Sequence, residues 1–196
     1  MNVRDQILSA IIEKNNHAVL ALLEKDPTLW DHYFDGETIL HLIVHNNNPE
    51  MIRALAKLPQ WANLVNKTTY PPAPKGIRPL MSAVWENNID CAKAIIESGI
   101  QSGSILHLDS QTAGGHTALT NAVEKENLEM VKLILNAPHI NNILNIKRKV
   151  DSKSALMIAV EKGSTDIVKA ILEMPETDFD AIANQKTAAQ IATEKG

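Results

Sequence analysis

Cysteine, basic charge and long apolar runs are all scarce in this sequence. The single cysteine, Cys91, excludes an intramolecular disulfide or a cysteine-rich zinc site and favours a reducing compartment, so we expect a cytoplasmic protein. No run of about 18 apolar residues occurs, and the charges near the N-terminus do not suit a signal peptide, so we expect no membrane insertion. The net charge of −4 means that the protein has no excess positive charge to attract the phosphates of a nucleic acid, so we expect no nucleic-acid partner.

The remaining composition is that of a folded chain. The 196 residues are 44% hydrophobic and 21% charged, which excludes a disordered protein and allows one large domain or two small ones. We take one domain as the simpler prediction.

A short pattern recurs along the chain, in which a small polar residue and a small residue precede leucine, as in Thr117, Ala118 and Leu119. The equivalent position falls at residues 8, 40, 80, 119, 156 and 189. Each copy continues with a polar pair, a turn residue and an apolar segment of helical period, as in residues 124–135. The sequence therefore predicts repeated pairs of helices.

This pattern resembles the ankyrin repeat, whose signature is a Thr-Pro-Leu-His start, a pair of small residues, a glycine turn and an apolar second helix. The resemblance covers nearly the whole chain and implies an all-α fold, an ankyrin-repeat α-solenoid of stacked helix-turn-helix pairs with protruding finger loops. We expect a single ankyrin-repeat domain over residues 1–196. Its expected parts are a degenerate N-terminal cap repeat (1–34), four repeats (35–74, 75–113, 114–150 and 151–183) and a partial C-terminal repeat (184–196).

The turn between the two helices of an ankyrin repeat usually contains glycine, because its backbone has a positive φ. We assign this position to Asn15, Asn47, Asn87, Glu126 and Gly163. Asparagine tolerates positive φ, so Glu126 is the one residue of this set that predicts a strained turn.

Three inserts, residues 59–76, 99–115 and 138–152, hold the extra length between repeats. We assign this length to the finger loops and not to longer helices. The first insert contains Tyr-Pro-Pro-Ala-Pro at residues 70–74, which should hold an extended polyproline conformation. This segment is either a stiff spacer or a binding element.

His41 and His45 stand four residues apart on one predicted helix, a spacing that can direct two imidazoles to one metal. The ankyrin resemblance implies instead that His41 is a structural histidine bonded to the backbone of a neighbouring turn and that His45 faces solvent. No third ligand follows from the spacing of the other residues, so we expect no metal.

Ser104, His107 and Asp109 are the residue types of a hydrolytic triad, but they crowd into one loop without a Gly-x-Ser-x-Gly elbow. Glycine-rich phosphate loops and paired catalytic carboxylates are also missing. We therefore expect no enzyme activity and no cofactor.

The only basic run, Lys147, Arg148 and Lys149, lies in a predicted finger, where it is either a solvated tip or an anion-binding group.

Cys91 matches an apolar position of a second helix, and we expect it to be buried and unreactive.

Two aromatic groups have open interpretations. Trp30, Tyr33 and Phe34 either cap the N-terminal core or form an exposed binding site. Trp85 matches a variable surface position of the first helix, where it either contacts a partner or packs under the insert of its own repeat.

The resemblance implies a protein–protein interaction module, which binds another protein through a concave groove of finger tips and first helices. We expect a monomer. The contact positions of the family fall on Phe34, Asp35, Glu37, His45, Asn46, Lys75, Ile77, Trp85, Glu86, His116, Glu124, Lys125, Asp151, Lys153, Glu161 and Lys162.

An alternative function is that this chain is the N-terminal recognition arm of a larger multidomain enzyme or secreted effector. The last predicted helix lacks its partner helix, and the abundant asparagine and drifted repeats resemble those of bacterial effectors, for which the host-cell cytoplasm is the expected location.

Overall fold

The computed structural model of the chain describes residues 2–71, 74, 76–140, 143–178, 182–183, 186–187, 189–190 and 193. The chain divides into two compact units, Met1–Leu106 and His107–Gly196. We call them unit 1 and unit 2 and describe each by itself.

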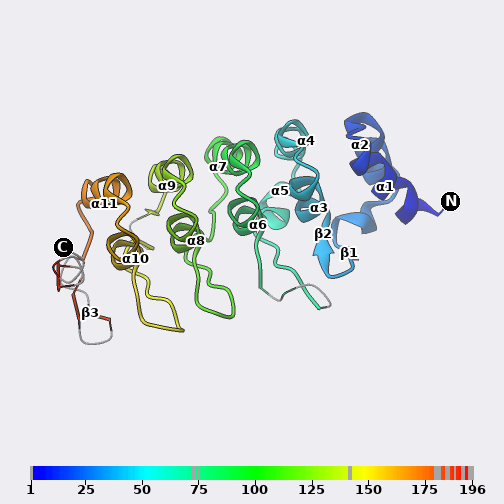
Figure 1. Cartoon of the computed structure of the whole chain (residues 1–196). Coiled ribbons are helices and arrows are strands. Elements are labelled where there is room, and N and C mark those ends of the chain that lie inside the picture. The colour runs from blue at the N-terminus through cyan, green and yellow to red at the C-terminus, as the bar shows by residue number, and fades with distance from the viewer. Residues whose placement is uncertain are drawn as a thin grey trace. The chain divides into compact units, whose positions relative to one another are not determined.

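Unit 1 is built from stacked helix pairs in two layers. Its elements are α1 (Val3–Ile12), α2 (Asn16–Lys25), the 3-10 helix η1 (Pro27–Trp30), β1 (Tyr33–Phe34), β2 (Glu37–Thr38), α3 (Ile39–His45), α4 (Pro49–Leu55), α5 (Trp61–Leu64), α6 (Pro79–Trp85) and α7 (Ile89–Ser102). The first helices α3 and α6 pack against each other in one layer, and the second helices α4 and α7 pack in the other (Figure 1). β1 and β2 form an antiparallel hairpin with Tyr33 opposite Thr38.

Unit 2 repeats the same arrangement. Its elements are α8 (Ala118–Glu124), α9 (Leu128–Leu135), α10 (Ala155–Lys162), α11 (Thr165–Leu172), β3 (Ile182–Ala183) and β4 (Lys186–Thr187). The first helices α8 and α10 pack against each other, as do the second helices α9 and α11. The predicted all-α ankyrin-repeat fold is therefore confirmed.

Leucines of the repeated pattern form the core between the layers. Leu40, Leu80, Leu119 and Leu156 are at most 6% exposed. Each such side chain stabilises the fold by about 1.5–3 kcal/mol on burial. Because a single helix pair cannot enclose this surface, the stability of each unit depends on contact between neighbouring pairs.

Asparagine begins most of the second helices. The side chains of Asn15, Asn48, Asn88 and Asn127 each accept a hydrogen bond from the backbone N–H three residues ahead, at 2.9–3.1 Å. Each cap satisfies an N–H that the helix leaves unpaired and contributes about 1 kcal/mol. The abundance of asparagine therefore has a local structural cause.

The tight turn before each cap adopts the predicted left-handed conformation, with one correction. Asn47, Asn87, Glu126 and Gly163 have φ values between 47° and 73°. In the N-terminal cap repeat the left-handed residue is Lys14, with a φ of 53°, and not Asn15 as the sequence predicted. Asn15 is instead the cap of α2, so the turn occurs one residue earlier.

Glu126 occupies a conformation that costs a side chain about 1 kcal/mol relative to glycine. Its carboxylate partly offsets this cost by accepting a hydrogen bond from Ser164 at 2.9 Å. Glu126→Gly relieves this cost but loses the hydrogen bond from Ser164. We expect the net effect to raise the free energy of unfolding by about 0.5 kcal/mol. Urea unfolding measures the change, with Asn47→Gly as the control that should gain less. A lower urea midpoint for Glu126→Gly would contradict this account of the turn.

The inserts extend the core as well as the loops, which corrects one prediction. α7 has 14 residues and continues through the start of the second insert, so helix length does account for part of the spacing. The first insert contains α5, whose Trp61 is 1% exposed. Ile143 and Leu144 are buried in the third. Pro72, Ala73 and Lys75 lie outside the described residues, so the predicted polyproline conformation stays a prediction.

Among the described residues, no helix is both long enough and apolar enough to cross a membrane.

Candidate partner-binding surface

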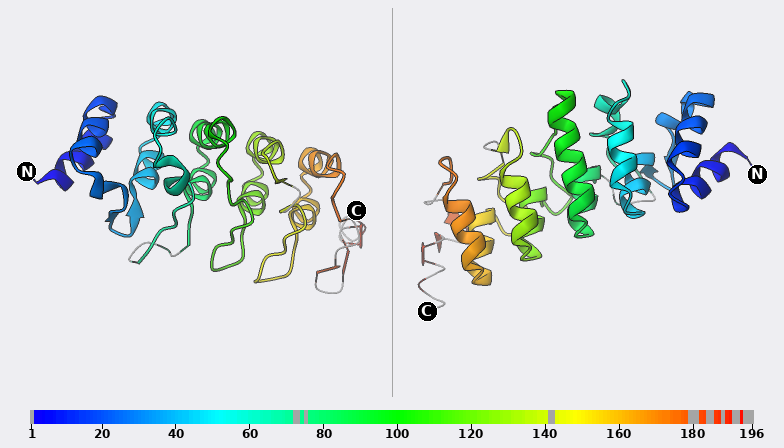
Figure 2. Two further views of the ribbon diagram at one scale, coloured as in Figure 1. Left: turned by 180° about the vertical axis from the view of Figure 1, so that it is seen from behind. Right: turned by 90° about the horizontal axis from the view of Figure 1, so that it is seen from above.

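Unit 1 presents two fingers, the turns that precede its first helices α3 and α6. The first finger, residues 33–38, is the β1–β2 hairpin. The second finger, residues 69–77, is closed by the backbone N–H of Thr69 donating to the carbonyl of Ile77 at 2.8 Å. The N–H of Tyr70 donates to the carbonyl of Gly36 at 2.6 Å, which joins the two fingers. Figure 2 shows the first finger and the described part of the second projecting from the same side of unit 1.

His41 connects α3 to the second finger from the inside. Its ring is buried, with Nε2 3.0 Å from the carbonyl of Ile77 and Nδ1 2.7 Å from the hydroxyl of Thr38. A carbonyl only accepts, so Nε2 carries the proton and Nδ1 accepts from the Thr38 hydroxyl. Burial lowers the pKa of His41 to about 4, so the ring is neutral and structural, as the resemblance implied.

His45 lies one turn further along α3 and bridges two carboxylates. Its Nδ1 is 3.2 Å from Oε2 of Glu37 on the first finger, and its Nε2 is 2.8 Å from Oε1 of Glu86 at the end of α6. Burial raises the pKa of Glu86, and the nearby Glu37 adds to this effect, although His45 opposes it. These three predicted contact residues therefore form one chain across neighbouring repeats.

Trp85, the residue before Glu86, is 60% exposed, so it does not pack fully under its own insert. Tyr33 and Tyr70, one on each finger, are 37% and 60% exposed, and their ring centroids are 6.2 Å apart. Unit 1 therefore exposes three large aromatic side chains on its fingers and at the end of a first helix. Exposed aromatic surface of this kind is typical of protein interaction sites.

Other predicted residues of unit 1 have different environments. Phe34 is 2% exposed, and its ring is nearly perpendicular to that of His32, with 4.8 Å between the ring centroids. It therefore belongs to the core, and the expected surface contact is not available. Asp35 is exposed on the finger, where it is 3.6 Å from Arg4. The Asn46 side chain donates to the carbonyl of Leu42 at 2.8 Å.

Two further predicted residues of unit 1 belong to the second finger. Ile77 is half-buried and provides the carbonyl that holds His41. Lys75 lies outside the described residues.

The two fingers of unit 2, residues 112–116 and 148–153, contact each other through their backbones. Gly115, with a φ of 82°, lies so close to the finger at residues 148–153 that an added Cβ would be 2.2 Å from the backbone nitrogen of Lys149. The side chain of Gln111 donates to the carbonyls of Gly115 at 2.7 Å and Lys147 at 2.9 Å. The spacing of these fingers is therefore fixed by a glycine and a glutamine.

Arg148 is 9% exposed, so this member of the basic run is not a solvated finger tip. Its guanidinium donates to the carboxylates of Glu124 and Asp151. Burial disfavours the charge, but the two carboxylates outweigh burial and raise the pKa of Arg148. The pKa of Asp151 is lowered because Arg148 and the backbone N–H of Lys153 outweigh its own burial.

The ion pairs continue around Arg148. Lys153 is 2.5 Å from Glu161 and 3.6 Å from Asp151, and Lys162 is 3.5 Å from Glu124. Most of the predicted charged contacts in unit 2 are therefore paired with one another. A partner that replaced these pairs would have to desolvate charges that are already satisfied.

His116 and Lys125 complete the predicted set in unit 2. His116 is half-buried, and its Nδ1 is buried without a hydrogen-bond partner in the described structure. Burial lowers its pKa, and the nearby Arg148 lowers it further. Lys125 is exposed just after α8.

Several residues considered for chemistry have structural surroundings. Within the described part of the chain, no group of three His, Cys, Asp or Glu residues has a metal-binding arrangement. The hydroxyl of Ser104 pairs with that of Ser102 at 2.9 Å. Cys91 is buried, as predicted, and burial raises the pKa of its thiol to about 11, which disfavours the nucleophilic thiolate.

Comparison with known proteins identifies the family to which these repeats belong. The ankyrin-repeat family profile, which describes three copies of the repeat, matches residues 7–105 and 103–183. The chain therefore belongs to the ankyrin-repeat family, whose members are generally protein-interaction modules. None of the curated proteins compared with the sequence matches it.

Two solved structures are similar over most of the chain. The ankyrin repeat domain of Bcl-3, described as a unique member of the IkappaB protein family, has a TM-score of 0.75 and 25% identity, and covers 97% of this chain and 80% of its own. The ankyrin repeat protein EF0377 has a TM-score of 0.76 and 24% identity, and covers 97% of this chain and 92% of its own. The likeness to EF0377 supports the fold alone.

Proposed function

We propose that this protein binds a partner protein through the fingers and the exposed ends of the first helices. The observation that carries the proposal is Trp85, a large aromatic side chain that is 60% exposed at the end of α6. Glu86, the next residue along the chain, is 2.8 Å from Nε2 of His45, so polar groups that can orient a partner adjoin the tryptophan in the sequence. Tryptophan surrounded by polar groups is the usual composition of a binding hot spot.

The two units contribute differently in this proposal. In unit 1 the exposed aromatic side chains offer apolar area, which gives affinity when it is buried. In unit 2 the charges around Arg148 are satisfied internally, so this surface favours a partner of matching shape and mixed charge without providing the main anchor. We therefore assign the dominant contribution to unit 1.

Replacing Trp85 should weaken the complex far more than replacing an equally exposed apolar residue elsewhere. We expect Trp85→Ala to reduce the affinity for a partner isolated with the wild-type chain by about 30-fold or more, the effect of losing a hot-spot tryptophan. Ile100→Ala is the matched control, because Ile100 is 54% exposed on α7. Isothermal titration measures both variants. Equal affinities for wild type and Trp85→Ala would exclude the proposed surface.

A further inference from the structure

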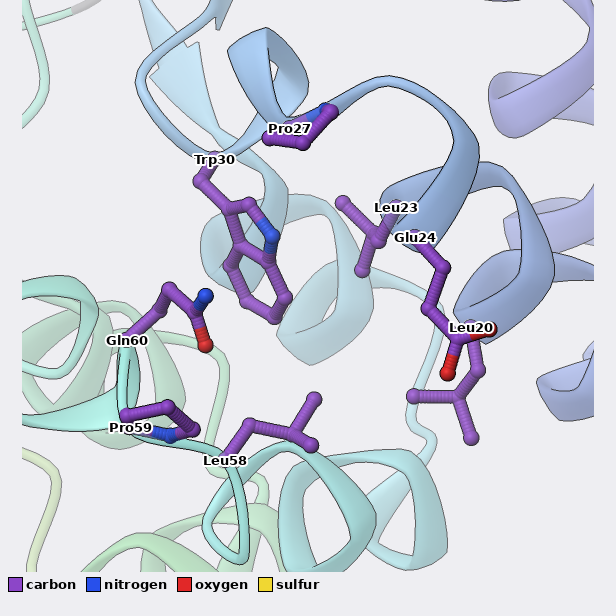
Figure 3. A pocket seen from close by; sticks show the side chains of 8 residues that line it. All are labelled: Leu20, Leu23, Glu24, Pro27, Trp30, Leu58, Pro59 and Gln60. Carbon is purple, nitrogen blue, oxygen red and sulfur yellow. The ribbon is translucent and has the colours of Figure 1, made fainter.

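Unit 1 contains a second candidate site, a pocket of about 300 Å³ formed by α2, η1 and the loop after α4. Figure 3 shows Trp30 on one side of the pocket, Leu20 and Leu23 of α2 on the other, and Leu58 below them. Leu23 is 1% exposed and Trp30 is 8% exposed, so the base of the pocket is a continuation of the core. The volume is sufficient for one large apolar side chain.

The first insert builds one wall of this pocket. Pro59 and Gln60 are its first residues, and Trp61, which follows them, is 1% exposed and fixes the insert to the core. A smaller recess of about 70 Å³ adjoins the pocket, because both are lined by Trp30 and Gln60. The insert therefore does more than separate two repeats.

The rim of the pocket has polar groups that the protein does not use internally. In the described part of the chain, neither the carboxylate of Glu24 nor the carboxamide of Gln60 makes an ion pair or a side-chain hydrogen bond. Both side chains border the apolar base in Figure 3. A carboxylate beside an apolar pocket is complementary to a ligand with an apolar body and a positive charge next to it.

We propose that this pocket binds a segment of a partner protein in which a large apolar side chain is adjacent to lysine or arginine. The apolar side chain occupies the space between Trp30 and Leu20, and the cation pairs with Glu24. Gln60 can donate to the segment's backbone carbonyl and accept from its N–H. This site uses none of the finger residues, so it stands or fails independently of the surface around Trp85.

The test is an NMR titration of the whole chain with three synthetic hexapeptides, acetylated and amidated at their ends. The probe is Gly-Ser-Phe-Lys-Ser-Gly, and the two control peptides replace its Phe with Ser or its Lys with Glu. We expect the probe to shift the Trp30 indole N–H resonance, assigned by its absence in Trp30→Phe, with a dissociation constant of about 1 mM. Loss of Phe should weaken binding by about tenfold or more, and the Lys-to-Glu change by about threefold.

The charge preference is tested with the variant Glu24→Lys, in which an exposed residue is replaced. The same spectra verify that this variant is folded. In this variant the peptide with Glu should bind more tightly than the peptide with Lys. Three results would overturn the proposal: no shift at Trp30 at saturating probe, equal binding of the Lys and Glu peptides, or shifts confined to Trp85 and the fingers. The last result would support only the finger surface.

Discussion

Acidification from pH 7.5 to 4.5 should remove about 2.5 kcal/mol of stability from unit 1 through His41 alone. The histidine is buried and neutral in the folded protein, with a pKa of about 4, against an ordinary value of 6.5. Below pH 6.5 the unfolded chain therefore binds a proton that the folded chain does not. The contribution of His41 to the free energy of unfolding is present above pH 6.5 and decreases as the pH falls towards 4. The slope is about 1.4 kcal/mol per pH unit, and the loss at pH 4 is about 3 kcal/mol.

The contribution of His41 is separated from that of the carboxylates by comparing variants. His41→Gln removes the titrating ring, and it should cost about 2 kcal/mol at pH 7.5 through lost packing and the lost bond to Ile77. The difference in the free energy of unfolding between wild type and His41→Gln should be about 2.5 kcal/mol less favourable to wild type at pH 4.5 than at pH 7.5. Urea unfolding at both pH values measures this, with His17→Gln on the exposed face of α2 as control. A constant difference between His41→Gln and wild type would refute the neutral, buried assignment.

Gly115→Ala should destabilise unit 2 by about 3 kcal/mol. The φ of 82° costs a side chain about 1–2 kcal/mol, and the Cβ would be 2.2 Å from the backbone nitrogen of Lys149. Because the obstacle is backbone, it cannot be relieved by a change of rotamer. The two fingers of unit 2 would have to separate, which would also disturb both bonds donated by Gln111.

Two other glycines separate the steric cost from the conformational one. Gly103→Ala has a φ of 67° with nothing within 4 Å of the added Cβ, so only about 1 kcal/mol should be lost. In Gly114→Ala the nearest atoms to the added Cβ belong to side chains, those of His116 at 3.3 Å and Thr112 at 3.9 Å, so the effect should be smaller than that of Gly115→Ala. Chemical unfolding followed by circular dichroism compares the three variants. A loss for Gly115→Ala no greater than that for Gly103→Ala would show that the fingers are not in backbone contact.

The repeat pattern was sufficient to predict the helix pairs and the left-handed turns, because both follow from local residue preferences. In four copies the turn residue follows the buried leucine by seven positions, as in Leu40 and Asn47. The first copy was aligned one residue too late, since Ile7 is the buried residue there and Lys14 is the turn. The asparagine at position 15 misled the alignment because asparagine suits both the turn and the cap.

The partners of the charged residues could not be predicted, because they depend on which side chains the fold brings together. From the sequence, Arg148 is either part of a solvated finger tip or an anion-binding group for a partner, yet it is buried between Glu124, 24 positions away, and Asp151. The family pattern predicts that Lys153 and Lys162 lie on the surface. It does not predict that each of them pairs with a carboxylate of a neighbouring element. No local signal distinguishes a charge that binds a partner from one that is already paired.

The pocket beside Trp30 was missed for a related reason. The spacing of the repeats indicated an insert after α4, and the predicted fold assigned its extra residues to a loop. The insert instead packs Trp61 into the core, and Leu58, just before the insert, lines the same pocket as Leu20 of a preceding repeat. A pocket that combines residues 38 positions apart is a property of the stacked repeats and has no short-range signature.

Site-specific photo-crosslinking tests the central claim, partner binding at the fingers and first-helix ends, most directly. A photoreactive phenylalanine analogue is introduced at Trp85 and, as a control, at the exposed Lys93 on α7. On irradiation with a partner isolated through the wild-type chain, we expect a crosslinked product from position 85 and none from position 93. Crosslinking from position 93 but not from position 85 would place the partner on the second-helix layer and contradict the proposed function.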